Sequence, residues 1–175
     1  MTTLGDVLLV LLADRGGTAH DIQRRHAGTF GSGQRVDISR VAWTLSRHER
    51  LGLVRSAASP THARQRRYEI TETGERRQRM WLLRVPPDAG AEEVRTRVLV
   101  AIEATDRATF EMVVSVCLAH VELSRLRTEP SQAAALSAES ARAELSDATL
   151  AAEVGWLHNL RTRRRQRDRV ETPLQ

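Results

Sequence analysis

Residues 36–70 constrain the fold more than any other part of this 175-residue chain. Asp37 is a good helix N-cap, because its carboxylate can accept hydrogen bonds from the free amides of a first turn. No Gly or Pro follows it before Gly52, which suits the position after a helix end. Ile38, Val41 and Leu45 recur at helical spacing, and His48 continues their row. The stretch therefore predicts a helix over 37–51 with one apolar side.

The opposite side of this predicted helix is polar and rich in arginine. Two short strand candidates, 53–56 and 67–70, follow it and flank a loop that is also rich in arginine. A helix with an arginine face followed by a hairpin with an arginine tip is the layout of a winged helix-turn-helix. We therefore predict a DNA-binding module with a two-stranded β-wing.

The preceding residues supply the rest of such a module. A first helix through Ala13 is apolar almost all round, as expected of a helix at the centre of a small domain. Thr18 is predicted to cap a second helix that reaches about His26, with Asp21 bonding back in a capping box. A link with several glycines then leads to the helix at 37–51, and Thr71 caps a further helix after the hairpin.

Charge is distributed unevenly along the chain. Residues 1–89 hold 15 arginines and 9 acidic residues, residues 90–160 hold 6 and 11, and residues 161–175 hold 6 and 2. The basic charge of residues 1–89 indicates that this part of the chain binds an anion. The acidic charge of residues 90–160 indicates that this part binds a different partner.

Several classes of protein are disfavoured. Cys117 is the only cysteine, so no disulfide framework and no cysteine metal site are expected, and an inert buried thiol is the simplest account of it. The apolar run 7–12 follows Asp6 and is far shorter than a membrane span. The histidines lack metal-ligand spacing, and no phosphate loop or nucleophile motif is present. We expect a cytoplasmic protein without membrane contact, metal, cofactor or enzymatic activity.

The Pro- and Gly-containing segment 86–90 is the clearest linker. It separates a predicted winged helix-turn-helix domain, 1–85, from a helical dimerisation and effector domain, 91–160, and we expect a basic, disordered tail over 161–175. The fold class is mostly α, with three to four helices and the wing followed by an all-helical part. Three consecutive helices cannot all hide their apolar stripes against one another, so we expect a two-fold homodimer. The residues assigned to its interface are Val98, Ile102, Val113, Leu150, Val154, Trp156, Leu157 and Leu160.

Three motifs, in this order, resemble the PadR family of bacterial transcriptional regulators. They are LSRHERLGLV over Leu45–Val54, RRYEITETG over Arg66–Gly74, and the weaker AEVGWL over Ala152–Leu157. The family's usual Tyr-Pro pair in the third helix is Ala42-Trp43 here. The resemblance implies a dimeric repressor that leaves double-stranded DNA when a small-molecule effector binds its C-terminal helices or its interface.

We expect the helix at 37–51 to enter the major groove and the wing to contact the DNA backbone or minor groove. Arg40 is the candidate for reading guanine, although a phosphate-bound or solvated arginine is an equal alternative. Trp43 can press on a thymine methyl or pack within the domain, and Trp156 can stack on an effector or anchor helix packing. The alternative function is a winged-helix module for protein–protein contact. The candidate DNA contacts are Ser39, Arg40, Trp43, Thr44, Arg47, Arg64, Arg66 and Arg67.

Overall fold

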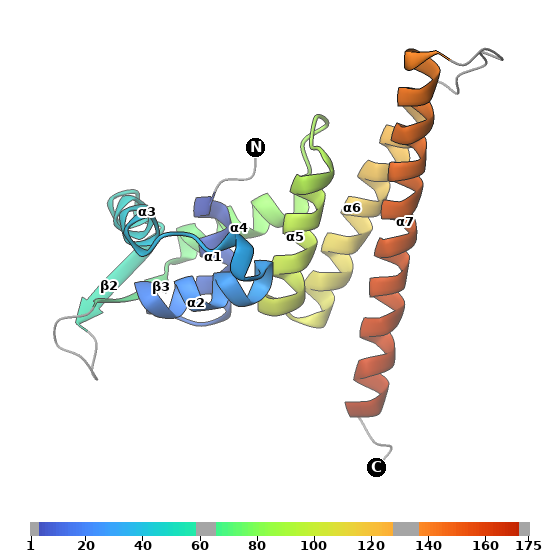
Figure 1. Cartoon of the computed structure of the whole chain (residues 1–175). Coiled ribbons are helices and arrows are strands. Elements are labelled where there is room, and N and C mark those ends of the chain that lie inside the picture. The colour runs from blue at the N-terminus through green and yellow to red at the C-terminus, as the bar shows by residue number, and fades with distance from the viewer. Residues whose placement is uncertain (1–3, 59–65, 128–136, 172–175) are drawn as a thin grey trace. The chain divides into compact units, whose positions relative to one another are not determined.

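The structure is a computed structural model that describes residues 4–58, 66–127 and 137–171 (Figure 1). Helices dominate it, which confirms the predicted mostly α fold class, and a small antiparallel sheet accompanies them. The elements are α1 (Leu4–Asp14), β1 (Gly17–Thr18), α2 (Ala19–Phe30), the 3-10 helix η1 (Ser32–Gln34), α3 (Ile38–Arg50), β2 (Val54–Ala58), β3 (Arg66–Ile70), α4 (Glu72–Leu83), α5 (Ala91–Ala104), α6 (Arg107–Arg127) and α7 (Ala138–Glu171).

Helix α1 lies at the centre of the first part of the chain. Its residues 8–12 are each at most 2% exposed, because α2, α3, α4, α5 and β3 all contact this helix. The prediction of a central helix that is apolar on all sides is confirmed. Its buried side chains form the apolar centre against which the surrounding elements pack.

The sheet has the strand order β1-β3-β2, and both pairings are antiparallel. Tyr68 of β3 lies opposite Ser56 of β2 and Gly17 of β1, and it is only 5% exposed, so the wing joins the core. We predicted two strands and missed β1, which has only two residues and no run of β-branched or aromatic side chains. The residue that could have indicated β1 is Gly16. An added Cβ atom there would lie 2.7 Å from the Tyr68 carbonyl oxygen, so only glycine allows the chain to come this close to β3.

Helix ends follow the local sequence closely. The Thr18 hydroxyl accepts from the Asp21 amide at 3.2 Å, and the Asp21 carboxylate accepts from the Thr18 amide at 3.0 Å, which confirms the capping box. The Asp37 carboxylate accepts from the Ser39 amide at 2.7 Å, so the predicted start of α3 is also confirmed. Gly52 has a φ of +68° directly after the cap residue Leu51, which is the left-handed conformation predicted there.

By its internal contacts the chain divides into two compact units, residues 1–113 and 114–175. This boundary differs from the predicted linker at 86–90, because α5 contacts both α1 and α2 and so belongs to the first unit. The buried side chain of Arg97 on α5 strengthens this attachment by donating to the carbonyl oxygens of Trp81 and Arg84 at the end of α4, at 3.0 and 3.4 Å.

The second unit consists of the C-terminal part of α6 and the long helix α7. Arg125 of α6 donates to Asp147 of α7 at 2.7 Å, which pairs the end of one helix with the other. The ribbons of α6 and α7 run side by side in Figure 1. We expected disorder over 161–175, whereas α7 is helical to Glu171, and residues 172–175 lie outside the described residues. None of the helices in the described part of the chain combines the length and apolar character that crossing a membrane requires.

Candidate nucleic-acid interface

Helix α3 presents one buried side and one exposed side, as its sequence predicts. Val41 and Leu45 are completely buried and His48 is 5% exposed, which holds the helix against α1. On the opposite side, Ser39, Arg40 and Arg47 are exposed, and Trp43 is 60% exposed. The tryptophan is therefore not packed within the domain, which removes one of the two interpretations left open for it.

Trp43 and Arg47 are neighbours on the exposed side of α3. Their spacing of four residues places them one turn apart, and the guanidinium carbon of Arg47 lies 5.9 Å from the tryptophan ring centroid. This is within the range of a cation–π contact. The pair thus offers a flat apolar surface with a positive charge beside it.

Thr44 does not share this surface, and its assignment as a DNA contact does not agree with its position. It is 7% exposed, and its hydroxyl donates to the carbonyl oxygen of Arg40 at 2.7 Å. Thr44 follows Val41 by three residues and precedes His48 by four, so it belongs to the buried row. That spacing was available in the sequence, but the hydroxyl suggested a surface position.

The wing adds further arginines, and acidic residues pair with some of them. Arg66 and Arg67 at the start of β3 are exposed, while Arg64 lies outside the described residues. Arg66 forms an ion pair with Glu49 at 3.1 Å, and Arg55 forms one with Glu69 at 2.9 Å. These exposed pairs reduce the free positive charge of the hairpin but leave its guanidinium groups at the surface.

Glu49 connects α3 to both strands of the wing, a role that the sequence analysis missed. One of its carboxylate oxygens accepts from the Ser56 hydroxyl of β2 at 2.6 Å, and the other pairs with Arg66 of β3. Glu49 therefore fixes the position of the hairpin relative to the last turn of α3. No sequence signal marked it, because its two partners lie 7 and 17 residues away.

His48 attaches α3 to the start of α1. Its Nε2 atom lies 3.1 Å from the carbonyl oxygen of Gly5, while Nδ1 has no hydrogen-bond partner among the described residues. Burial lowers the pKa of His48 below its ordinary value, so the neutral imidazole is favoured. A Cβ atom on Gly5 would approach Nε2 to 2.7 Å, so the two helices meet without room for a larger residue.

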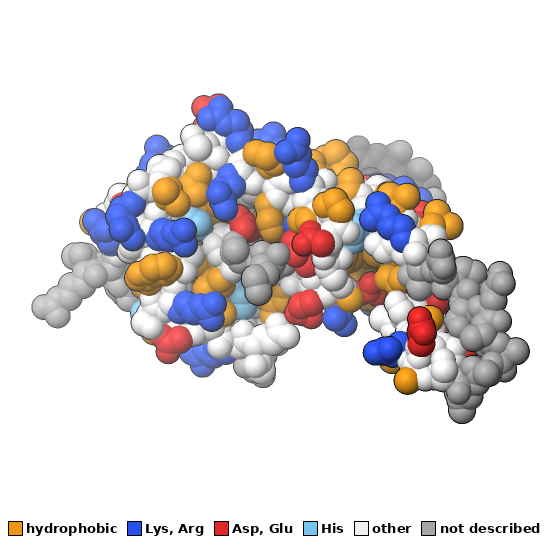
Figure 2. Space-filling model, turned by 90° about the horizontal axis from the view of Figure 1, so that it is seen from above, with side chains coloured by type: hydrophobic (Ala, Val, Ile, Leu, Met, Phe, Trp, Pro, Cys, Tyr) orange, Lys and Arg blue, Asp and Glu red, His pale blue; other side chains and the backbone are white. Residues whose placement is uncertain are grey.

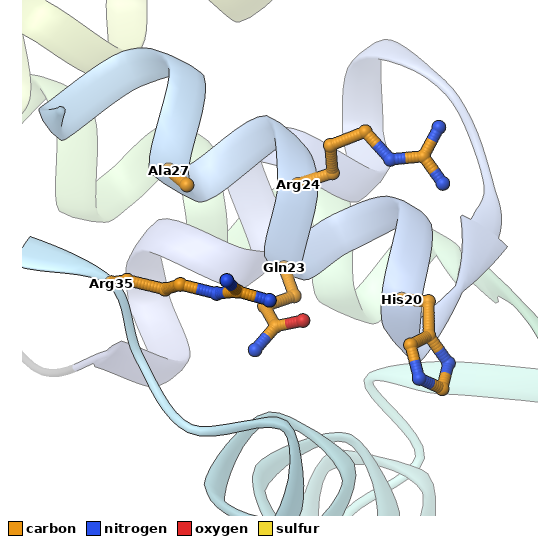
Figure 3. A pocket seen from close by; sticks show the side chains of 5 residues that line it. All are labelled: His20, Gln23, Arg24, Ala27 and Arg35. Atoms are coloured by element: carbon orange, nitrogen blue, oxygen red, sulfur yellow. The ribbon is translucent and has the colours of Figure 1, made fainter. Parts of the chain in front are cut away.

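A hollow lies beside the start of α3 and was also missed by the sequence analysis. Its volume is about 420 Å³, and it is lined by four α2 residues and by Arg35 of the link to α3 (Figure 3). The Gln23 amide nitrogen donates to the Val36 carbonyl oxygen at 2.8 Å and thereby ties this link to α2. Residues far apart in sequence form the hollow, so no local motif indicated it.

The predicted dimer residues fall into two groups. Val98, Val113 and Leu157 are completely buried within the chain, so they have no surface to offer a second copy. For Val98 the cause is the packing of α5 in the first unit. The other members of the predicted set are partly exposed: Ile102, Leu150, Val154, Trp156 and Leu160. Larger apolar surfaces occur at residues that we did not select: Leu123, Leu126 and Leu145, exposed to 53%, 82% and 68%.

Arginine side chains occur at many points of the face seen in Figure 2, with exposed hydrophobic side chains between them. Among the described residues, no three histidine, cysteine or acidic side chains are grouped so that they could hold a metal ion. The exposed side of α3 carries hydroxyl, guanidinium and indole groups, and the start of β3 adds two more guanidinium groups. Groups of these kinds can bind phosphate oxygens and base edges.

Comparison with protein-family models gives no match, and comparison with the sequences of curated proteins gives none. Among solved structures, the chain is similar to Bacillus subtilis PadR in complex with operator DNA. The likeness covers 92% of this chain and 99% of that chain, at 16% sequence identity and a TM-score of 0.42.

Proposed function

We propose that the protein is a cytoplasmic, DNA-binding transcriptional regulator, with α3 as its recognition helix. The exposed side of α3 carries this proposal, because Arg40, Trp43 and Arg47 extend from a helix whose other side is locked into the core. The sequence motifs that resemble the PadR family agree with this assignment. The proposal also accounts for the basic charge of residues 1–89.

In the proposed mechanism α3 enters the major groove. A helix with its side chains is about 10–12 Å across, and the groove of B-DNA is about 12 Å wide. Arg40 reads a guanine through its planar fork of donors, Trp43 contacts a thymine methyl or a sugar, and Ser39 and Arg47 approach phosphates. Arg66 and Arg67 of the wing contact the neighbouring backbone, and Arg64 is proposed to do so from outside the described residues.

We further propose that the protein acts as a two-fold dimer. Exposed leucines on α6 and α7 support this, because a second copy would remove their apolar surface from water. A dimer would place two α3 helices about 34 Å apart on a near-palindromic operator. We also propose that the protein represses transcription and that a small-molecule effector releases it from DNA.

The test is a binding assay on fragments of the DNA next to the protein's own gene, followed by fluorescence anisotropy on the selected site. Arg40→Ala should weaken binding by about 5- to 150-fold, which corresponds to the loss of about 1–3 kcal/mol for a bidentate base contact. Arg79→Ala is the matched control, because Arg79 is also an exposed arginine, lies on α4 and is paired with Glu75 at 3.7 Å. It should leave affinity within about twofold.

The salt dependence separates base contacts from phosphate contacts. For the unmodified protein, log affinity should fall with log salt by about 0.9 for each neutralised phosphate. Arg40→Ala should retain this slope if Arg40 reads a base, and lose about one unit if it binds phosphate. Absence of DNA binding at low salt would overturn the proposal and leave the protein-interaction module as the remaining interpretation.

A further inference from the structure

Two adjoining hollows lie between α2 and the link that leads to α3. The first, of about 420 Å³, is lined by His20, Gln23, Arg24, Ala27 and Arg35 (Figure 3). The second, of about 370 Å³, shares His20, Gln23 and Arg35 with the first and extends to the residues at the start of α3. Because three residues line both, the two form one continuous depression in the first unit.

Positive charge in this depression is concentrated at Arg35. No carboxylate among the described residues forms an ion pair with it, and its side chain lines both hollows. Arg24 extends away from Arg35 and lies 3.7 Å from Asp21. Both side chains of this pair are exposed and the pair is long, so Asp21 neutralises Arg24 only in part.

The walls between these charges are apolar in character. Ala27 and the aliphatic stems of Gln23, Arg24 and Arg35 surround the first hollow. The acidic residue Asp37 lines only the second hollow, and hydrogen bonds from Ser39 lower the pKa of its carboxyl, which keeps it ionised. An anion is therefore favoured in the first hollow and repelled from the second.

We propose that the first hollow binds a small organic phosphate, with the phosphate group on Arg35 and His20 and the uncharged body against Ala27. The guanidinium fork matches two phosphate oxygens, and the imidazole can donate a further hydrogen bond. The volume favours a molecule with a body, since ligand sites occupy about 300–1,000 Å³. A single backbone phosphate of a duplex would leave most of this space to water.

Such a ligand would act on α3 through the link. Gln23 holds the Val36 carbonyl oxygen at 2.8 Å, and α3 begins at Ile38, two residues later. A molecule seated between α2 and residues 35–36 contacts the segment that sets the start of α3. This consequence, a small ligand altering DNA affinity, depends on the proposed function, whereas ligand binding itself does not.

The experiment is a titration of the isotopically labelled full-length protein, without DNA, followed by NMR of the His20 ring and the Gln23 side-chain amide. The probes are phenyl phosphate, inorganic phosphate and phenol. Phenyl phosphate should give saturable shifts at both groups, inorganic phosphate should bind at least about tenfold more weakly, and phenol should give none. A tenfold difference corresponds to about 1.4 kcal/mol from the apolar body.

Two variants locate the site. Arg35→Gln should weaken phenyl phosphate at least about tenfold, while Arg79→Gln, on a different surface, should leave its affinity unchanged. Ala27→Leu fills the apolar wall, so it should reduce the binding of phenyl phosphate while inorganic phosphate still binds. The amide spectra of the variants report whether the fold is retained.

The proposal is overturned by any of three results. These are no saturable shift with phenyl phosphate, equal binding by the protein and its Arg35→Gln variant, or shifts spread evenly over exposed arginines outside the depression. A duplex that perturbs His20 and Gln23 while phenyl phosphate does not would assign the depression to a backbone phosphate and would equally overturn it. A protein that binds phenyl phosphate but no DNA would retain this site and lose only the proposed function.

Discussion

Packing favours the neutral form of two histidines in the first unit. His48 and His26 are 5% and 7% exposed, and each has a buried Nδ1 atom without a hydrogen-bond partner among the described residues. Burial is the largest cause of the lowered pKa of both imidazoles. Their ionisation is thus coupled to folding, because the unfolded chain solvates both rings.

The sign of the resulting pH dependence follows directly. The unfolded chain binds protons near the ordinary histidine pKa of 6.5, whereas the folded protein resists protonation until lower pH. The free energy of unfolding should therefore be highest above this value and fall as the pH decreases below it. His48→Gln should flatten the fall by up to about 1.4 kcal/mol per pH unit, the limit for one proton. Urea denaturation between pH 5 and 8 measures this pH dependence, with a His20→Gln variant at an exposed histidine as the control. A His48→Gln variant whose free energy of unfolding falls with pH as steeply as that of the unmodified protein would contradict the prediction.

Among the glycines of the first unit, Gly74 leaves the least room for a side chain. It lies in the first turn of α4, and an added Cβ would overlap the carbonyl oxygen of Leu53. The same carbonyl accepts from the amide of Thr71 at 3.0 Å, so the end of the α3–β2 turn is fastened to the start of α4. A side chain at position 74 would have to separate these segments.

Gly74→Ala should lower the free energy of unfolding by about 2–4 kcal/mol, since backbone atoms cannot move aside as a flexible side chain can. Gly28→Ala in α2 is the matched control, because nothing lies within 4 Å of a Cβ there. That change should stabilise the helix by up to about 1 kcal/mol through helix propensity. Thermal and urea unfolding of the two variants give the comparison, and equal effects of the same sign would refute the role of close packing.

At the scale of elements, the buried side chain of Arg97 on α5 bonds to the end of α4 and is paired with Glu93 on its own helix. The Arg97 side chain is 1% exposed and donates to the Glu93 carboxylate at 2.8 Å. Its guanidinium carbon lies 4.7 Å from the Trp81 ring centroid, and its Nε donates to the Trp81 carbonyl oxygen. The Arg97 side chain thus supplies hydrogen-bond donors to the free carbonyl oxygens at the end of α4 and holds α5 beside that helix.

Arg97→Met should destabilise the protein by about 3–5 kcal/mol, because Glu93 and the helix-end carbonyls lose a buried donor. The double change Arg97→Met with Glu93→Leu should recover part of this loss, since the carboxylate that lost its guanidinium donor is then replaced by an apolar group. Urea denaturation of both variants tests the pair. A double variant less stable than Arg97→Met alone would contradict this account.

Local chemistry made the elements themselves predictable. The caps at Thr18, Asp37 and Thr71 and the turn at Gly52 depend on residues within a few positions, and each is confirmed. What the sequence did not indicate depends on distant partners. The strand β1 forms only because β3 lies beside it, and α5 joins the first unit through packing on α1.

The candidate site divides in the same way. Helical periodicity predicted the exposed positions of Arg40, Trp43 and Arg47. The burial of Thr44 was missed, although its spacing of three residues from Val41 places it on the buried row. Glu49 and the depression at Arg35 could not be predicted, because their geometry joins segments separated by turns whose path the periodicity does not determine. A proposed interface drawn from apolar stripes alone likewise included residues that the chain buries for itself.

At the scale of the whole molecule, the second unit leaves apolar surface uncovered. Leu123 and Leu126 on α6 and Leu145 on α7 are each more than half exposed, in a unit whose Arg125–Asp147 pair ties the two helices together. Leucines as exposed as these favour association with another apolar surface. We take this surface, rather than the buried part of the predicted set, as the centre of the proposed dimer.

Sedimentation equilibrium should give a dimer for the full-length protein at micromolar concentration. Leu126→Glu with Leu145→Glu should shift the mass to that of the monomer, because charge would be buried in an apolar contact. Leu51→Glu, at an exposed leucine of the first unit, should leave the dimer intact. A full-length protein that remains monomeric at high concentration would remove the two-fold arrangement from the proposed function.

The attachment of the hairpin by Glu49 sets a fixed spacing between two parts of the first unit. Its two carboxylate oxygens engage Ser56 and Arg66, so β2, β3 and the last turn of α3 are joined at one residue. For a protein that binds DNA as proposed, the distance between the contact of α3 in the major groove and the contact of the wing with the neighbouring backbone is then fixed. An operator with a base pair inserted between these two points would lose one contact or the other, and Glu49→Gln would relax that constraint without removing any group that touches the duplex.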